Sequence, residues 1–238
     1  MGIWTASNNA IVAAMTQLLI AGLAPAFVPY REGWALQRRV HEAVVSGEGP
    51  EHLILCEHEP VYTAGKLTRP HERPDDGTPV VEVDRGGRIT WHGPGQLTGY
   101  PIVRLPEPVD VVAHVRLLEE VMLQTITELG VIGRRIDGRS GVWVDPVAGG
   151  PAAKIGAVGV RVQAGVTLHG FALNCDNSLE PFGHIVACGI ADAGVTTISA
   201  ELGRRVTPSD VAERVSEIFE ALRPGWTAAS VTTIGAAA

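Results

Sequence analysis

The sequence contains three cysteines, and one of them lies where a nucleophile would have space around it. Cys188 is followed directly by Gly189 in Ile-Val-Ala-Cys-Gly-Ile, and glycine lets the backbone turn tightly beside a substrate. Cys56 lies inside the apolar run Leu-Ile-Leu-Cys, which is typical of a buried, unreactive thiol. Cys175 follows Phe-Ala-Leu-Asn and fits either role. Cys188 is therefore the first candidate for covalent catalysis.

A nucleophilic thiol needs a partner that removes its proton or stabilises the thiolate. His92, His169 and His184 are candidates, and so are the two lysines, Lys66 and Lys154, which stand against seventeen arginines. A partly buried lysine can lose its proton near neutral pH, whereas arginine cannot. Lys154 opens the predicted strand Lys-Ile-Gly-Ala-Val-Gly, where glycines allow close approach of a ligand to the backbone. The alternative is a surface lysine at a strand edge.

Two further segments combine glycine with polar side chains. Arg85-Gly-Gly-Arg-Ile-Thr-Trp-His-Gly-Pro-Gly-Gln96 is too rich in glycine for a regular helix or strand. Its backbone N–H groups and arginines suit a loop that wraps a ligand or an oxyanion, although a structural hairpin tip fits as well. The segment lacks the phosphate-binding P-loop pattern. His169 and Gly170 break an otherwise apolar strand, which indicates either a site residue or a hydrogen-bonded core histidine.

The elements that would position these residues are predicted from periodicity. Apolar residues at helical spacing predict helices over residues 32–46 and 110–129, and Thr207 followed by Pro208 predicts the start of a third. Short apolar or alternating runs predict strands. These strands cover residues 52–56, 80–83, 99–105, 141–145, 154–163 and 166–174, with the last two paired through Ala-Gly. Because no repeat or linker interrupts this order, we expect one α+β domain with a mixed sheet flanked by helices.

Composition narrows the function. With 238 residues, 45% hydrophobic and 19% charged, the chain is globular, and its net charge of −7 argues against a nucleic-acid binder. Three cysteines without Cys-x-x-Cys spacing favour reduced thiols, a cytoplasmic location and no metal. Residues 10–26 are mostly apolar but have no preceding Lys or Arg and are too short to cross a membrane. We expect a leader or a packed helix there.

Together these segments resemble the lipoyl(octanoyl) transferase family over about residues 28 to 222. The matching motifs occur in family order. They are Arg85-Gly-Gly-x-x-Thr-x-His-Gly-Pro-Gly-Gln96, Gly141-Val-Trp, Lys154-Ile-Gly-Ala-x-Gly-Val-Arg161, Leu168-His-Gly-Phe-Ala-Leu-Asn174 and Cys188-Gly189. Two departures are visible, since the family usually has proline where Ala187 stands, and residues 146–151 match poorly. Residues 1–27 are unmatched, residues 28–224 form the expected catalytic domain, and residues 225–238 are an expected frayed tail.

The resemblance implies transfer of octanoyl from acyl carrier protein to a lysine of lipoyl domains, in 2-oxoacid dehydrogenases and the glycine cleavage H protein. It implies a fold like that of lipoate and biotin protein ligases, with neither cofactor nor metal, and no nucleic-acid or membrane partner. The nucleophile position falls on Cys188, the residue that activates it falls on Lys154, and His169 is a possible supporting residue. The implied substrate-binding residues are Arg85, Gly86, Gly87, Arg88, Ile89, Thr90, Trp91, His92, Ala157, Val158, Gly159, Gly170, Phe171 and Ala172.

The chemistry would be ping-pong through a thioester on Cys188, with backbone N–H groups near Gly170 and Phe171 as the expected oxyanion donors. Because both protein partners are expected to be acidic, docking would need a local basic face on this acidic chain. Candidates for that face are Arg134, Arg135, Arg139 and Arg161. Three other functions remain open: an ATP-dependent lipoate or biotin ligase, a hydrolase with a Cys–His pair, and a non-catalytic acyl-binding module.

Overall fold

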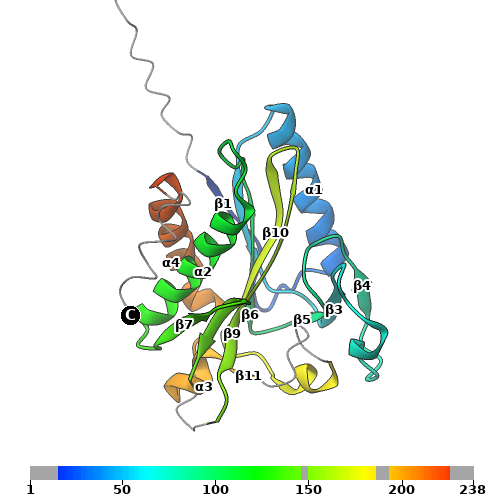
Figure 1. Cartoon of the computed structure of the whole chain (residues 1–238), viewed down its shortest axis with the longest axis vertical. Helices are drawn as coiled ribbons and strands as arrows, with labels where there is room; N and C mark the ends of the chain where they lie inside the picture. The colour runs from blue at the N-terminus through cyan, green and yellow to red at the C-terminus, as the bar shows by residue number, and fades with distance from the viewer. Residues whose placement is uncertain (1–15, 146–149, 186–192, 226–238) are drawn as a thin grey trace, which may run out of the picture.

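The computed structural model describes residues 16–145, 150–185 and 193–225 of the chain (Figure 1). The predicted nucleophile Cys188, the residue before it and most of the predicted tail lie outside the described residues. Every helix within the described ranges is too short or too polar to span a lipid bilayer.

A mixed sheet forms the centre of the fold. Its strand order is β1-β2-β6-β10-β9-β8-β7, with β11 pairing to β9, and a smaller sheet has the order β4-β3-β5. In chain order the strands are β1 (Gln17–Gly22), β2 (His52–Cys56), β3 (Val61–Ala64), β4 (Val80–Glu82), β5 (Thr90–His92), β6 (Gln96–Ile102), β7 (Gly133–Ile136), β8 (Arg139–Val144), β9 (Ala153–Gln163), β10 (Val166–Asn174) and β11 (Gly194–Val195). In the main sheet the pairs β1–β2 and β9–β11 are parallel, and the other pairs are antiparallel.

Helices cover both faces of the main sheet. The helices are α1 (Tyr30–Ser46), α2 (Val111–Glu128), α3 (Ile198–Leu202) and α4 (Pro208–Leu222), with short 3₁₀ turns η1 (Pro70–Glu72), η2 (Glu180–His184) and η4 (Arg223–Gly225). Helix α1 packs on β6 and β10 from one side, and α2 and α4 lie together on the other (Figure 1). This arrangement makes a layer of sheet between two layers of helix.

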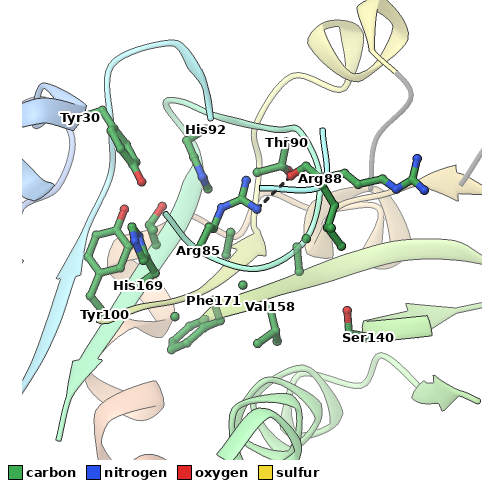
Figure 2. Close-up of a pocket in the computed structure, with 17 residues that line it drawn as sticks. Tyr30, Arg85, Arg88, Thr90, His92, Tyr100, Ser140, Val158, His169 and Phe171 are labelled. Carbon is green, nitrogen blue, oxygen red and sulfur yellow. Dashed lines mark hydrogen bonds between the residues drawn. The ribbon is translucent and has the colours of Figure 1, made fainter. Parts of the chain in front are cut away.

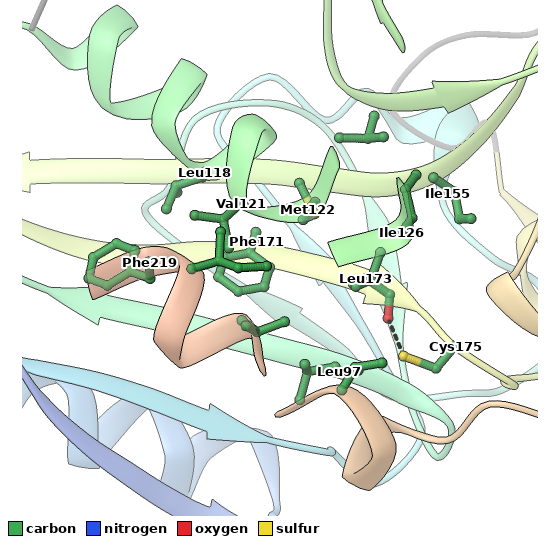
Figure 3. Close-up of a cluster of buried hydrophobic side chains, with 14 of the residues drawn as sticks. Leu97, Leu118, Val121, Met122, Ile126, Ile155, Phe171, Leu173, Cys175 and Phe219 are labelled. Atoms are coloured by element: carbon green, nitrogen blue, oxygen red, sulfur yellow. Dashed lines mark hydrogen bonds between the residues drawn. The ribbon is translucent and has the colours of Figure 1, made fainter. Parts of the chain in front are cut away.

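The main hydrophobic core lies between α2, α4 and the sheet (Figure 3). Leu118, Met122 and Ile126 recur at helical spacing and are fully buried there, together with Phe219 of α4. Each such side chain stabilises the fold by about 1.5–3 kcal/mol through removal of apolar surface from water. Asp110 caps α2 by accepting a hydrogen bond from the Ala113 N–H at 2.8 Å.

The sequence predictions of the α+β class and of its longest elements are confirmed. The helix expected over 110–129 is α2, and the helix expected to start after Thr207 is α4. The paired strands expected over 154–163 and 166–174 are β9 and β10, joined by Ala164 and Gly165 in left-handed conformations with φ of 50° and 73°. Alternating and β-branched residues over nine or more positions made this pair predictable.

Two local predictions are wrong. For the leader or packed helix expected over residues 10–26, residues 10–15 lie outside the described residues, and the described part contains a strand at 17–22 that pairs in parallel with β2. The segment 85–96, expected to exclude any regular strand, contains β5, which pairs with β3. In both cases the strand is fixed by a partner strand far along the chain, which local composition does not report.

Candidate active site

A cavity of about 200 Å³ lies between the main sheet and the loop that follows Asp84 (Figure 2). Strands β6, β10 and β9 form its floor, and Ser140 of β8 lies at one end. All three predicted binding stretches contribute to its lining. From the first stretch come Arg85, Gly87, Arg88, Thr90 and His92, and from the other two come Ala157, Val158, Gly159, Gly170, Phe171 and Ala172.

The floor is open because its residues are small and directly paired. Ala172 lies opposite Ala157, and Gly170 lies opposite Gly159, across the β10–β9 ladder. Paired residues of antiparallel strands present their side chains on the same face. The alanines and glycines at these four neighbouring positions therefore leave a space above the sheet, which larger side chains would fill.

Arg85 holds the roof over this floor. Its Nη1 donates to the carbonyl oxygens of Gly86 and Arg88, both at 2.9 Å, and its Nη2 donates to Thr63 O at 2.8 Å and Oγ1 at 2.9 Å. Figure 2 shows the guanidinium within the cavity wall. A Cβ on Gly159 would lie 2.8 Å from Arg85 Cδ, so glycine at 159 is what allows the arginine to lie against the sheet.

Three predicted binding residues do not line the cavity. Ile89 and Trp91 point away from it and form a separate apolar cluster with Tyr62. Gly86 bridges the loop to the sheet, because its N–H donates to Val160 O at 3.1 Å. The alternation of side chains along the extended backbone separates these residues from their lining neighbours.

One of the expected oxyanion donors, the Phe171 N–H, lies on an internal strand of the main sheet. Phe171 pairs with Val158 on one side and with Gly99 on the other. Backbone N–H groups of such an internal strand lie in the plane of the sheet, whereas the cavity lies over its face. The Phe171 N–H therefore belongs to the sheet ladder rather than to the cavity.

Two tyrosines and a threonine that the sequence analysis did not single out close one end of the cavity. Tyr30 at the start of α1, and Thr98 and Tyr100 of β6, line this end together with His92. The Tyr30 and His92 rings are stacked with centroids 6.0 Å apart. Single tyrosines in apolar stretches look like core residues, so only the pairing of β6 with β10 brings them here.

Buried histidines behind this end are uncharged. His58 Nδ1 donates to Val28 O at 2.8 Å, which leaves Nε2 to accept from the Tyr100 hydroxyl at 2.7 Å. His92 Nδ1 donates to Gln96 Oε1 at 2.7 Å. Burial lowers the pKa of His58 to about 4 and that of His92 to about 3, with the latter also lowered by His58.

His169 has an unusual backbone, and its side chain has a single hydrogen-bond partner among the described residues. Its φ of 59° is left-handed, which is costly for a residue other than glycine, and its N–H donates to Gln37 Oε1 at 3.0 Å. Its Nε2 lies 2.8 Å from Asp84 Oδ1, and Asp84 also pairs with Arg161. Burial lowers the pKa of His169 to about 3, with further lowering by Arg85 and Arg161. His169 lines the cavity, and its supporting role stays a prediction.

Lys154 lies next to the opposite end of the cavity. The side chain is 9% exposed, and its Nζ is 4.6 Å from the centroid of Trp143 on the neighbouring strand. Lys154 itself does not line the cavity. A Cβ on Gly141 would lie 3.4 Å from Lys154 Cε and 3.5 Å from the Cα of Ala157, a lining residue. The lysine therefore reaches the Ser140 and Ala157 end of the cavity.

Glu119 of α2 fixes the turn beside that lysine. The fully buried carboxylate accepts from the Gly141 N–H at 2.7 Å and from Arg116 and Arg135 at 2.6 and 3.1 Å. Gly141 has a φ of 104° and would place a Cβ 2.4 Å from Gly156 O. Glycine is required at this position because a side chain would displace the neighbouring strand.

The two described cysteines are buried core residues. Cys56 is 1% exposed and Cys175 is fully buried, and both are free thiols. Burial raises the pKa of each thiol well above its ordinary value. Both therefore stay protonated at neutral pH and are poor nucleophiles. The sequence left Cys175 open as either a nucleophile or a buried core thiol, and the structure shows it as a buried core thiol (Figure 3).

The arginines proposed for a basic docking face are engaged with carboxylates or aromatic rings. Arg134 pairs with Asp145 at 2.7 Å, and Arg135 pairs with Glu119 and Glu120. Arg161 pairs with Asp84, and the Arg139 guanidinium lies 5.9 Å from the Trp143 ring centroid. Neighbouring carboxylates cancel much of their charge, so these four residues do not form a uniform basic surface. Within the described ranges, histidines, cysteines and carboxylates do not gather in groups of three that could hold a metal ion.

Comparison with known proteins places these features in a family. Residues 29–220 match the family described as the lipoyl protein ligase A/B catalytic domain. The chain is 61% identical over 187 residues to an octanoyltransferase of Mycolicibacterium smegmatis, covering 79% of this chain and 82% of that protein. It is 52% identical over 199 residues to an octanoyltransferase of Renibacterium salmoninarum, covering 84% and 85%.

The fold is also similar to a bipartite lipoate protein ligase solved with its E2 lipoyl domain from Thermoplasma acidophilum. The TM-score is 0.66 at 16% identity, with 86% of this chain and 82% of that chain covered. This likeness agrees with the predicted resemblance to lipoate protein ligases. By family match and by identity to named relatives, the chain belongs to the octanoyltransferases, a family built on the lipoyl protein ligase A/B catalytic domain.

Proposed function

We propose that this protein transfers octanoyl from octanoyl-acyl carrier protein to a specific lysine of lipoyl domains, through a thioester on Cys188. The acceptor domains would be those of 2-oxoacid dehydrogenases and of the glycine cleavage H protein. The reaction would be the first step of protein lipoylation and would take place in the cytoplasm, which suits the free thiols of Cys56 and Cys175.

The observation that carries this proposal is the small-residue cavity with a buried lysine beside one end. Its floor of alanines and glycines offers space for a slender alkyl chain, and Lys154 lies by the end where the reacting carbonyl would be. Burying an alkyl chain contributes about 0.8 kcal/mol per CH₂. Relatives at 52–61% identity named octanoyltransferase give the acyl group its expected length.

The proposed reaction has two balanced steps. In the first, the Cys188 thiolate attacks the octanoyl thioester, the carrier leaves as a thiol after taking up a proton, and one thioester replaces another. This exchange needs no ATP because both bonds are of the same kind. In the second, the acceptor lysine amine attacks the acyl-enzyme, an amide forms, and the Cys188 thiolate leaves while Lys154 relays the proton of the amine.

The identity of the nucleophile is supported by elimination. Of the three cysteines, Cys56 and Cys175 are buried with raised thiol pKa values. Incubation with octanoyl-acyl carrier protein, followed by intact-mass measurement and peptide mapping, should place one octanoyl group on Cys188. An unmodified protein, or an adduct on Cys175, would refute the thioester mechanism.

The role of Lys154 is tested by a matched pair of lysine variants. Lys154→Arg keeps the positive charge but cannot exchange a proton near neutral pH, and we expect turnover to fall by about 10²–10⁴-fold. Lys66→Arg changes the other lysine of the chain, which is exposed, and should transfer octanoyl as the wild type does. Near-normal turnover by Lys154→Arg would remove the lysine from proton transfer.

The same assays separate the alternatives. An ATP-dependent ligase would use free octanoate with ATP and would survive Cys188→Ser. A cysteine hydrolase would release free octanoate without an acceptor domain and would be lost in His169→Ala but not in Lys154→Arg. A non-catalytic binding module would bind octanoyl without any covalent adduct.

A further inference from the structure

Two residues that line the cavity each carry a buried polar atom without a hydrogen-bond partner among the described residues. The two atoms are Oγ1 of Thr98 and Nδ1 of His169, and both residues are 1% exposed. Buried polar groups are nearly always paired with protein, water or ligand, because leaving them unpaired costs free energy. An octanoyl chain could not pair with either atom.

The hydrogen-bonding character of His169 is fixed by its surroundings. Asp84 Oδ1, 2.8 Å from Nε2, selects the tautomer in which Nε2 carries the proton. Because the ring is uncharged at neutral pH, Nδ1 presents a lone pair and accepts a hydrogen bond. The missing partner of His169 is therefore a donor.

A third polar group faces the same region. Figure 2 shows the Tyr30 hydroxyl pointing toward Tyr100 and His169, and Tyr30 lines the cavity with them. The Tyr100 hydroxyl already donates to His58 Nε2. Tyr30, Thr98 and His169 thus offer two hydroxyls and one acceptor at one end of the cavity, here called the polar recess.

The polar recess is at the far end of the cavity from Lys154. Thr98 belongs to β6, two strands from β9 in the order β6-β10-β9, while Lys154 belongs to β9 and lies beside β8. Neighbouring strands are about 4.8 Å apart, so Thr98 is roughly 10 Å across the sheet from β9, and His169 on β10 lies between them. An acyl chain whose carbonyl lies near Lys154 would direct its last carbons into the recess.

We propose that the polar recess binds a hydroxyl group at the distal end of the acyl chain, so that the protein transfers medium-length ω-hydroxyacyl groups in addition to octanoyl. The terminal hydroxyl would donate to His169 Nδ1 and accept from Tyr30 or Thr98. This inference rests on the proposed octanoyl transfer, and it adds a second substrate class to it. A plain chain of the same length would instead leave Thr98 Oγ1 and His169 Nδ1 without partners.

The test compares two acyl groups of equal size. The 8-hydroxyoctanoyl and nonanoyl groups differ by a hydroxyl in place of a methyl, and both are offered on acyl carrier protein. We expect kcat/KM for 8-hydroxyoctanoyl to exceed that for nonanoyl by about tenfold, whereas an apolar cavity end would favour nonanoyl. A ratio of one or less would overturn the proposal.

Variants assign the preference to the recess. Thr98→Val removes one hydroxyl at constant shape and should lower the ratio of kcat/KM for 8-hydroxyoctanoyl to that for nonanoyl several-fold. Tyr30→Phe should lower this ratio by a similar factor. Thr98→Ser keeps a hydroxyl and should show the wild-type ratio. Thr125→Val is the control, because this buried hydroxyl already donates to Val121 O at 2.8 Å on α2, outside the cavity. An unchanged ratio in both Thr98→Val and Tyr30→Phe would overturn the assignment.

Binding of the free acids separates this proposal from the proposed function. Calorimetry with 8-hydroxyoctanoate and nonanoate measures the recess without any transfer. If the wild type transferred no octanoyl but still bound the hydroxy acid about tenfold more tightly, the proposed function would fail and the recess would stand. If octanoyl were transferred but nonanoate bound more tightly, the recess alone would fail.

Discussion

Replacing Gly159 with alanine tests whether the cavity depends on the contact between Arg85 and the sheet. The new Cβ would lie 2.8 Å from Arg85 Cδ and 3.5 Å from Nε and Nη1. A separation under 3 Å forces the arginine to move, and its four hydrogen bonds to Thr63, Gly86 and Arg88 cannot all follow. The roof of the cavity should then shift away from its floor.

The size of the effect follows from these contacts. Adding one methyl group to a well-packed site costs typically about 1–3 kcal/mol. In a domain of this size, each kcal/mol lowers the melting temperature by about 2–4 °C, so Gly159→Ala should melt about 2–12 °C below the wild type. If the same energy is lost in acyl binding, kcat/KM for octanoyl transfer should fall by about 5–150-fold.

A matched alanine variant supplies the control. A Cβ on Gly86 would meet its nearest neighbour, Val160 O, at an ordinary 3.7 Å, and Gly86 does not line the cavity. Gly86→Ala should therefore melt and react nearly as the wild type does. Calorimetric melting and steady-state transfer are measured for both variants. The reasoning fails if Gly159→Ala behaves like the wild type, or if Gly86→Ala is equally impaired.

Two further predictions concern buried charge. Glu119→Gln should destabilise the fold by about 3–5 kcal/mol in urea unfolding, because it leaves Arg116 and Arg135 without their buried carboxylate. The control is Glu120→Gln, at a partly exposed carboxylate, which should cost under about 1 kcal/mol. Equal losses in the two variants would contradict this account. Burial lowers the pKa of His114 to about 4, so the unfolded chain binds its proton first as the pH falls. The stability that this histidine contributes is complete above pH 6.5 and is lost as the pH falls toward 4. Between these pH values, His114→Gln should reduce the slope of unfolding free energy against pH by up to about 1.4 kcal/mol per pH unit. An unaltered slope would show that His114 does not titrate this way.

The sequence predicted the site best where local pattern and tertiary pairing agree. Small residues at 157, 159, 170 and 172 lie on two strands joined by a two-residue turn, so their register follows from the turn itself. This is why two separate glycine-rich motifs meet on one cavity floor. The loop from Arg85 to His92 joins them only because β5 pairs with β3, and glycine content alone did not predict that strand.

Residues fixed by long-range contacts were not predictable. Tyr30 opens a helix and Tyr100 lies within a buried strand, and both patterns are those of ordinary core residues. Their place in the site depends on where α1 packs against β6, which involves residues some 70 positions apart. The same limit applies to β1, whose partner β2 follows after a complete helix. Cys188 and Ala187 lie outside the described residues, so the role of the nucleophile stays a prediction.

The hydrogen bonds of Arg85 have a consequence for the thermodynamics of substrate binding. The guanidinium binds carbonyl oxygens of the roof and of β3, all of them within the protein, so the roof is held in place before any acyl chain arrives. Binding to a preorganised cavity avoids the entropy loss of ordering a loop. Association of alkyl thioesters should therefore approach the rate of a rigid-body encounter, with a heat-capacity change set by the alkyl chain alone.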